Sequence, residues 1–324
     1  MERTLQHQWR EAPPARLEFD LGGEARVLTI ADPFAVLLTE MSDVFRVVNF
    51  KEGSEVMEVS CSSCDNVPEA LLSKDVLLVV LDVGGVSEVL AWIVPTRQEI
   101  FNKKFPCVWP VFDQHNKQVM LGSNTRLEIS GNTVIESTVN LPPPPGSGFL
   151  RLLAFSHPHY VTRGPSALWK MDGTTIVKLG TVDSGRPVFC PAGDILIIWS
   201  ATYRDQIKVS FYNLLTSQLI KVRDLTRPAG FSVLGDESHC VNANQLVLLG
   251  RQLPRGWTVL LVYELDVLLS QAADEDISPR VFQIAQTDWD LRKRIDVNKT
   301  SISAVQVPWE RKKIITLDFW NCET

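Results

Sequence analysis

Short apolar runs, separated by polar turns, follow one another along the whole chain. They are rich in Val, Ile, Leu, Phe and Trp, and Gly, Pro, Asn, Asp and Ser bound them. Runs of this length and composition are typical of β-strands. The predicted strands include residues 25–30, 34–39, 44–50, 76–81, 89–94, 119–121, 195–199, 207–212, 246–249, 258–263 and 314–319. Helical periodicity is confined to residues 264–273 and 288–295, so the pattern predicts an all-β fold with a short helix or two.

Two predicted hairpins share one pattern at a distance of 163 residues. Residues 44–59 read VFRVVNFKEGSEVMEV and residues 207–222 read IKVSFYNLLTSQLIKV. In both, about seven strand-like residues and a polar turn precede an apolar pair, which a charge and Val follow. Comparable pairs recur along the chain at Val56-Met57, Ile100-Phe101, Val134-Ile135, Ile176-Val177, Leu219-Ile220 and Val281-Phe282.

The spacing of these pairs indicates a repeat architecture. Successive pairs lie 44, 34, 42, 43 and 62 residues apart. A four-stranded propeller blade takes about 40–45 residues. Short turns explain the interval of 34, and an insertion explains the interval of 62. We expect residues 265–294, with the acidic run Asp274-Glu275-Asp276, to protrude from the ring as a partly helical insertion.

Strand arithmetic at the two ends predicts how the ring closes. Residues 301–307 and 313–319 provide two strands for the last blade, and the N-terminus provides two more, a weak one at residues 5–10 and a good one at residues 16–21. Pairing the N-terminal strand with the last blade would cover an edge that otherwise invites aggregation. We therefore predict one domain over residues 1–324, a β-propeller of four-stranded antiparallel blades. Seven blades are preferred, with six as the alternative, and residues 141–148 form a linker between blades.

Three hairpins also carry a resemblance to a known family. VFRVVNFKEGSEVMEV, SALWKMDGTTIVKL and IKVSFYNLLTSQLIKV resemble the third strand, turn and fourth strand of WD40-type repeats, and the segment from Trp169 to Gly173 is nearest to the Trp-Asp turn of that family. The Gly-His and Trp-Asp signatures are absent, so the resemblance assigns the family's His–Asp network to no residue here. The propeller part of F-box proteins is also similar, although residues 1–324 contain no F-box-like helical segment.

Composition narrows the classes of function. Hydrophobic residues make up 45% of the chain, and the net charge is -6. The chain can therefore bury a sizeable core, while its acidity disfavours nucleic acid or membrane binding over the whole surface. No stretch resembles a signal peptide or a membrane span, and six cysteines are too few for a disulfide scaffold. We expect an intracellular protein, cytoplasmic or nuclear.

Catalytic and metal-binding motifs give little support to an enzyme. GxSxG, HExxH and P-loop patterns are absent from the sequence. Cys61 and Cys64 form a single CxxC where a structural zinc site needs four ligands. His157 and His159 flank Pro158, which favours a surface loop over a metal site. We predict no catalytic residue, no cofactor and no metal.

Binding residues are predicted from exposed aromatic and basic positions. Trp92, Trp169 and Trp199 lie inside apolar strands and are expected in the core. Four tryptophans near polar segments, together with two arginines of a basic cluster, are the candidate interaction residues, since Trp and Arg are common binding anchors. These residues are Trp257, Trp289, Trp309, Trp320, Arg292 and Arg294.

Three functions remain open from the sequence. The first is a non-enzymatic protein–protein interaction scaffold, a monomeric propeller within a complex of other proteins. The alternative is a substrate-recognition module of an F-box-like ubiquitin-ligase assembly. The second alternative is a propeller enzyme with a site at the channel mouth. The prolines at 142–145 add a possible polyproline ligand for an aromatic groove.

Overall fold

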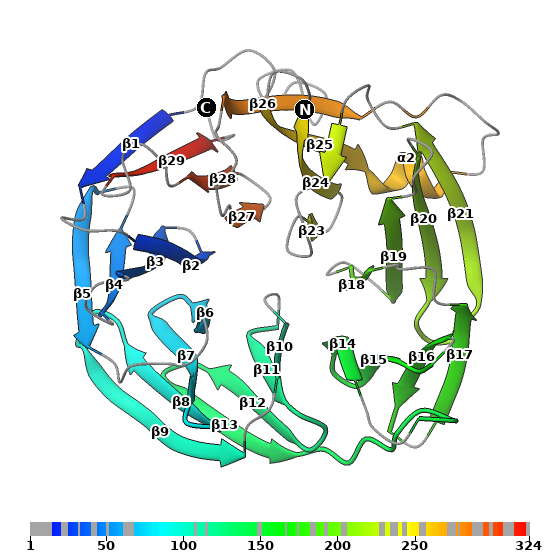
Figure 1. The fold of residues 1–324 in the computed structure, drawn as a ribbon, viewed down its shortest axis with the longest axis horizontal. Helices are drawn as coiled ribbons and strands as arrows, with labels where there is room; N and C mark the ends of the chain where they lie inside the picture. The colour runs from blue at the N-terminus through cyan, green and yellow to red at the C-terminus, as the bar shows by residue number, and fades with distance from the viewer. Residues whose placement is uncertain are drawn as a thin grey trace.

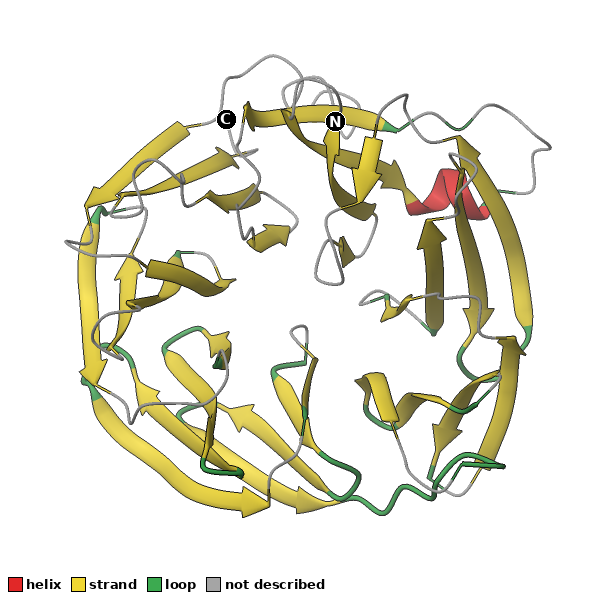
Figure 2. Ribbon diagram, in the orientation of Figure 1, coloured by secondary structure: helices red, strands yellow, loops and turns green. Residues whose placement is uncertain are grey.

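The fold is a ring of antiparallel β-sheets arranged radially around a central axis (Figure 1). The computed structural model describes residues 15–20, 25–31, 33–39, 44–49, 52–60, 68–106, 109–113, 116–147, 151–165, 167–173, 175–181, 186–190, 194–201, 206–226, 231–233, 239–241, 245–252, 257–270, 277, 279–286, 294–297, 301–306 and 314–321. Strands dominate this part of the chain, and one short helix interrupts them (Figure 2). The predicted all-β propeller is therefore confirmed.

The described strands form seven sheets, which we call blades, six of four strands and one of five. The first three that the chain completes contain β2 (Ala25–Ala31), β3 (Phe34–Thr39), β4 (Val44–Asn49) and β5 (Ser54–Ser60); β6 (Glu69–Ser73), β7 (Val76–Val83), β8 (Val86–Ile93) and β9 (Gln98–Pro106); and β10 (Pro110–Asp113), β11 (Gln118–Leu121), β12 (Thr125–Ser130) and β13 (Thr133–Thr138). In each, the first strand is innermost and the fourth lies at the circumference (Figure 1).

The next three blades repeat this order. They contain β14 (Arg151–Ser156), β15 (His159–Arg163), β16 (Ala167–Asp172) and β17 (Thr175–Thr181); β18 (Arg186–Phe189), β19 (Ile195–Ala201), β20 (Gln206–Asn213) and β21 (Leu219–Thr226); and β22 (Phe231–Val233), β23 (His239–Val241), β24 (Gln245–Gln252), β25 (Trp257–Glu264) and β26 (Arg280–Gln286). All six apolar pairs that revealed the repeat lie on outermost strands, β5, β9, β13, β17, β21 and β26, as the repeat predicted.

The last blade joins the two ends of the chain. β27 (Arg294–Val297), β28 (Ser301–Gln306) and β29 (Ile314–Asn321) pair in sequence, and β1 (Ala15–Asp20) adds to β29 as the outermost strand. Ala15 lies opposite Phe319 and Asp20 opposite Ile314. The predicted closure by an N-terminal strand is confirmed for β1. The fourth strand of this blade is β27, and residues 5–10, predicted as a weak strand, lie outside the described residues.

The core consists of apolar layers between neighbouring blades. Each buried cluster draws its residues from two adjacent sheets; Met57 and Leu77, for example, share one layer, and Phe211 and Leu261 share another. Both faces of most blades are therefore covered, which a single four-stranded sheet cannot achieve alone.

Side-chain hydrogen bonds cross five successive seams between the described blades. From β2–β5 onward around the ring, they are Arg97 Nη2 to Val56 O, Lys103 Nζ to Glu136 Oε2, Asn116 Nδ2 to Ser156 Oγ, Lys170 Nζ to Ser217 Oγ and Arg223 Nε to Leu268 O. Apolar packing is non-directional, so these hydrogen bonds help to fix the orientation of neighbouring blades.

The expected insertion over residues 265–294 is wrong in extent. Strand β26 lies within it and pairs with β25, and β27 begins at Arg294. The extra residues of this blade lie between β25 and β26 and begin with helix α2 (Leu265–Leu269), whose Leu265 and Leu268 are buried. The apolar face of α2 packs into the core, so the helix does not protrude, and residues 271–276 with the acidic run lie outside the described residues. Of the second predicted helix, residues 294–295 belong to strand β27, and residues 288–293 lie outside the described residues.

The proline-rich linker lies between β13 and β14, as predicted. Val139 N donates to Asn124 O at 2.7 Å and Leu141 N to Ser123 O at 3.3 Å. Leu141 and Pro144 are buried, while Pro143 and Pro145 are exposed. This connection is thus held against the preceding blade.

Candidate interaction surface

The β20–β21 hairpin exposes a cluster of large apolar side chains. Eight such side chains are exposed in the described part of the chain, and four of them belong to this hairpin: Leu215, Leu219, Ile220 and Val222, at 68%, 52%, 47% and 39%. All four lie at the circumference or at the turn of one blade (Figure 1). We call these four residues the hairpin patch.

The matching β4–β5 hairpin on the opposite part of the ring exposes less apolar surface at the equivalent place. The strand register places Met57, opposite Val47, at the position of Lys221, opposite Phe211, so Val56 matches Ile220. Val56 is half-buried, whereas Ile220 is 47% exposed. Met57 packs in the layer between the β2–β5 and β6–β9 blades. The residues of β5 that match Leu219 and Val222 are Glu55 and Glu58, so the apolar exposure of β21 has no counterpart in β5.

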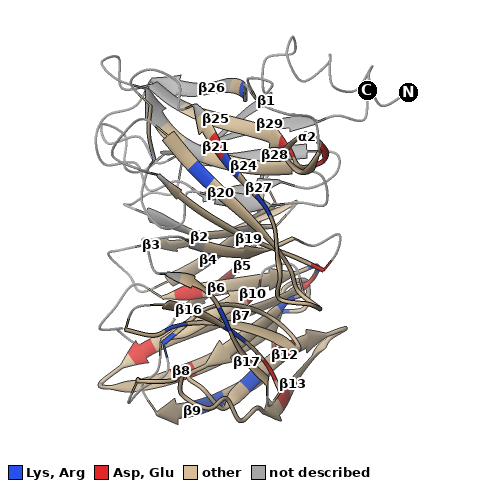
Figure 3. Ribbon diagram, turned by 90° about the vertical axis from the view of Figure 1, so that its right-hand side faces the viewer, with Lys and Arg blue, Asp and Glu red and all other residues tan. Residues whose placement is uncertain are grey.

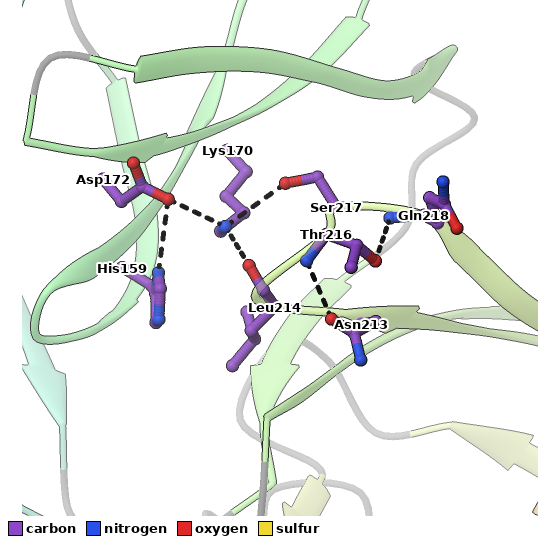
Figure 4. A network of polar contacts seen from close by, with 8 residues as sticks. All are labelled: His159, Lys170, Asp172, Asn213, Leu214, Thr216, Ser217 and Gln218. Carbon is purple, nitrogen blue, oxygen red and sulfur yellow. Dashed lines mark hydrogen bonds and ion pairs between the residues drawn. The ribbon is translucent and has the colours of Figure 1, made fainter.

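A buried lysine of the preceding blade holds the turn of this hairpin in place (Figure 4). Lys170 of β16 is only 2% exposed. Its Nζ donates to Asp172 Oδ2 at 3.0 Å, to Ser217 Oγ at 3.2 Å and to the carbonyl oxygen of Leu214. A buried charge is tolerated only with such partners. These contacts fix the turn from both its ends and leave Leu215 outside.

The turn is also braced from within. Thr216 N donates to Asn213 Oδ1 at 2.8 Å, and Leu214 N donates to Asp194 O at 2.7 Å. Ser217 adopts a positive φ of 57°, which closes the turn into β21. Because Leu214 is buried and Leu215 is exposed, this bracing decides which leucine faces solvent.

On its other side the hairpin contacts helix α2. Arg223 Nε donates to Leu268 O at 3.1 Å and Arg223 Nη2 to Ser270 O at 2.8 Å, while Lys221 Nζ donates to the same Ser270 oxygen. Cations at the last carbonyls of a helix are favourable. Val267 of this helix is itself 46% exposed.

The imidazole of His159 lies at the edge of the lysine network. Its Nδ1 is 3.8 Å from Asp172 Oδ2. Burial lowers the pKa of His159, and the Lys170 ammonium lowers it further, against the opposing carboxylates of Asp172 and Asp194. His159 is therefore expected to be neutral near pH 7.

Basic and acidic residues alternate over the outer strands on this side of the ring (Figure 3). No single sign of charge covers the circumference in the described part. Apolar exposure, and not net charge, is therefore what distinguishes the β20–β21 hairpin from its neighbours.

The predicted interaction residues do not gather at this surface. Trp257 begins β25 opposite Gln286, Trp320 lies in β29 opposite Ile302, and Arg294 begins β27 opposite Val305. Trp289, Trp309 and Arg292 lie outside the described residues. Their proposed binding role stays a prediction.

The other residues singled out from the sequence are partly placed by the structure and partly outside the described residues. Trp92 and Trp199 are in the core, at 5% and 1% exposed, whereas Trp169 is only half-buried. His157 lies in the turn before β15, but His159 is part of that strand, so the surface-loop interpretation fails for His159. Cys61 and Cys64 lie outside the described residues. The residues that the structure does describe contain no cluster of three or more His, Cys, Asp or Glu positioned to hold a metal.

Sequence reasoning missed the exposed apolar residues. Trp109, before β10, is 83% exposed, and the hairpin patch was interpreted only as a landmark of the repeat. One signal was available: Leu214-Leu215 places two leucines in a turn, where polar residues are usual.

Comparisons with known proteins identify the fold. No protein-family model matches the sequence, and no curated protein matches it. Among solved structures, Hsv2 of Kluyveromyces lactis is similar with a TM-score of 0.56 at 11% identity, covering 87% of this chain and 90% of that chain. The Cps50 (Swd1) β-propeller domain of Myceliophthora thermophila has a TM-score of 0.56 at 10% identity, covering 96% and 99%.

Two further similar structures differ in their activity. A chain of the mitotic checkpoint complex has a TM-score of 0.53 at 14% identity, covering 96% of this chain and 94% of that chain. Streptogramin B lyase has a TM-score of 0.52 at 10% identity, covering 97% and 99%. The fold of this chain is therefore that of a WD40-like β-propeller, and it alone decides neither for nor against catalysis.

Within the described part, no helix is long and apolar enough to cross a membrane.

Proposed function

We propose that this protein is a non-enzymatic interaction scaffold that binds another protein through the hairpin patch. The observation that carries the proposal is the exposure of Leu215, Leu219, Ile220 and Val222 on one braced hairpin. Soluble proteins rarely leave large apolar patches uncovered unless something binds there.

Two features of the hairpin support a binding role. The contacts of Lys170 and Arg223 hold the hairpin from neighbouring elements on both sides, so little conformational freedom remains to be lost on binding. Similar folds also occur in assemblies, as in the mitotic checkpoint complex. The ubiquitin-ligase hypothesis stays a prediction, since nothing in the described residues favours it.

The test compares two variants that differ only in which outer strand they alter. Ile220→Asp places a charge in the hairpin patch, and Ile135→Asp places one on β13, where Ile135 is 49% exposed against 47% for Ile220. Proteins retained by affinity purification with the parent and with Ile135→Asp, but lost with Ile220→Asp, are ligands of the patch.

A purified ligand then provides the quantitative test. We expect Ile220→Asp to weaken its binding by about tenfold or more, as for a residue in the centre of an interface. If the parent and both variants retain the same proteins with the same affinity, the hairpin patch is not the binding surface.

A further inference from the structure

Two arginines face each other at one end of the β14–β17 blade. Arg151, the first residue of β14, is the register partner of Arg163, the last residue of β15. Both side chains are exposed. Directly opposed residues of an antiparallel pair point to the same face of the sheet, where like charges repel.

These two guanidinium groups differ from the other arginines whose side chains the structure describes. Arg46, Arg97, Arg126, Arg223 and Arg280 each contact an acidic group, a hydroxyl or a backbone carbonyl. Neither Arg151 nor Arg163 makes a hydrogen bond or an ion pair with another described residue. The repulsion between them is therefore not offset by a neighbouring carboxylate within that part of the chain.

The backbone around this pair is rigid. Gly164 N donates to Ala167 O at 2.9 Å, which closes the turn that follows Arg163. A Cβ at position 164 would lie 2.8 Å from Trp169 Nε1, so only glycine fits between the turn and this indole. Arg163 consequently leaves the sheet from a fixed position opposite Arg151.

The innermost strand of the adjacent blade starts at the same end of the ring. Arg186 begins β18, and β18 lies beside β14 in the ring. Both are innermost strands that start at the same end, so their first residues share one rim of the ring (Figure 1). The hairpin patch belongs to the opposite end, because His159 and Asp172 pair there, next to the turn that Lys170 holds.

We propose that this rim, the arginine rim of Arg151 and Arg163, binds a short acidic segment of a partner protein. Guanidinium groups bind carboxylates through paired hydrogen bonds, and two of them in register suit neighbouring carboxylates on an extended segment. Bound carboxylates would also offset the repulsion between the arginines. This site is independent of the hairpin patch.

The charge of the chain favours a peptide over a lipid surface or a nucleic acid. With a net charge of -6, the protein repels a densely anionic surface except at local basic spots. A duplex or an anionic membrane is held by many cations over a wide area. A short acidic segment contacts only the rim itself.

The test uses fluorescence anisotropy with a fluorescein-labelled peptide of about eight glutamates, an extended chain long enough to span the rim at roughly 3.3 Å per residue. We expect saturable binding that Arg151→Glu and Arg163→Glu each weaken by about tenfold. Arg163→Lys should weaken it less, since it keeps the charge and loses only the paired geometry.

Lys178→Glu is the matched control. Lys178 is exposed on β17 of the same blade, and this substitution changes the net charge by the same amount as Arg151→Glu. We expect its affinity for the peptide to stay within about twofold of the parent. An equal loss for Lys178→Glu would mean that net charge and not the rim governs binding, and would overturn the proposal.

A second measurement separates the peptide from a membrane. Vesicles of phosphatidylcholine and phosphatidylserine are sedimented with the parent and with Arg151→Glu. The proposal is wrong if the vesicles bind the parent but not Arg151→Glu while the peptide binds both equally. It is also wrong if the peptide shows no saturable binding. Thermal unfolding checks that Arg151→Glu is folded; it should melt no lower than the parent, because Glu opposite Arg163 replaces a repulsive pair by an attractive one.

Discussion

At the scale of single residues, the buried Lys170 links two blades and positions the turn of the hairpin patch. Its side chain is almost completely buried, and its Nζ donates to Asp172 of the same strand and, across a blade seam, to Leu214 and Ser217 (Figure 4). A point charge in such a position costs free energy when any partner is missing. The stability of the seam and the place of the hairpin patch therefore depend on this one ammonium group.

Replacing this lysine should destabilise the whole protein. Lys170→Ala leaves the Leu214 carbonyl and the Asp172 carboxylate without their donor, which should lower the free energy of unfolding by about 2–4 kcal/mol. Urea denaturation measures the change. Lys178→Ala, an exposed lysine of the same blade, should alter it by no more than about 0.5 kcal/mol. Equal effects for the two lysines would contradict the buried role of Lys170.

His159 should make the stability depend on pH. The folded-state pKa of His159 lies below its ordinary value of 6.5, chiefly through burial and then through Lys170. Between these two pKa values the unfolded chain binds more protons than the folded one, so stability falls as pH is lowered through 6.5. Above that pH the group has no effect.

The measurement is the free energy of unfolding at about pH 7.5 and about pH 5. His159→Gln cannot titrate at this position, so it should lose less stability over that interval than the parent. His157, whose pKa burial also lowers, is present in both proteins and cancels in the comparison. An identical loss in the parent and in His159→Gln would refute the assignment.

At the scale of elements, the β20–β21 hairpin and helix α2 form one unit across a seam. Two cations of β21 meet the last carbonyls of α2, while Leu265 and Leu268 are buried on its inner face. A helix of five residues has little stability of its own, since forming its first turn is costly. The contacts from β21 should therefore decide how often α2 opens.

Hydrogen exchange should detect this dependence. Arg223→Ala removes the bonds to Leu268 and Ser270, so amides of residues 265–270 should exchange several-fold faster, for a loss of about 1–2 kcal/mol in local opening energy. Arg97→Ala removes the comparable bond to Val56 in a distant seam and should leave these amides unchanged. Unchanged exchange in Arg223→Ala would show that the buried leucines alone hold the helix.

At the scale of the whole molecule, ring closure joins the two ends of the chain. β1 supplies the outermost strand of the last blade, opposite β29, so residues 294 to 304 positions apart pair in one sheet. Closure removes an edge that would otherwise expose unpaired backbone groups. Cooperativity of unfolding should therefore depend on this N-terminal strand.

Two truncations test closure. Deleting residues 1–21 removes β1 and should cause aggregation or lower Tm by about 10 °C or more, because every backbone bond to β29 is lost. Deleting residues 1–14 leaves β1 intact and should keep Tm near that of the parent. If both truncations melt like the parent, the ring closes without β1.

The strand pattern, the repeat and the closing strand were all predictable from the sequence. Alternating apolar residues and turn residues act locally, so residues 16–21 were recognisable as a strand wherever they paired. The apolar pairs, such as Val56-Met57 and Leu219-Ile220, marked the outer strands because each blade repeats the same local structure.

The exposure of these strands was decided only by the tertiary structure. Val56 and Ile220 occupy equivalent register positions in two similar hairpins, yet Val56 is half-buried and Ile220 is 47% exposed. The same holds for Lys170, whose burial depends on the turn of another blade, and for Arg151 and Arg163, which meet only through strand register. Local sequence determines which strands form, because backbone preferences and turns are short-range. Burial and charge pairing depend on what lies across each seam, and the sequence pattern of one blade contains no information about its neighbour.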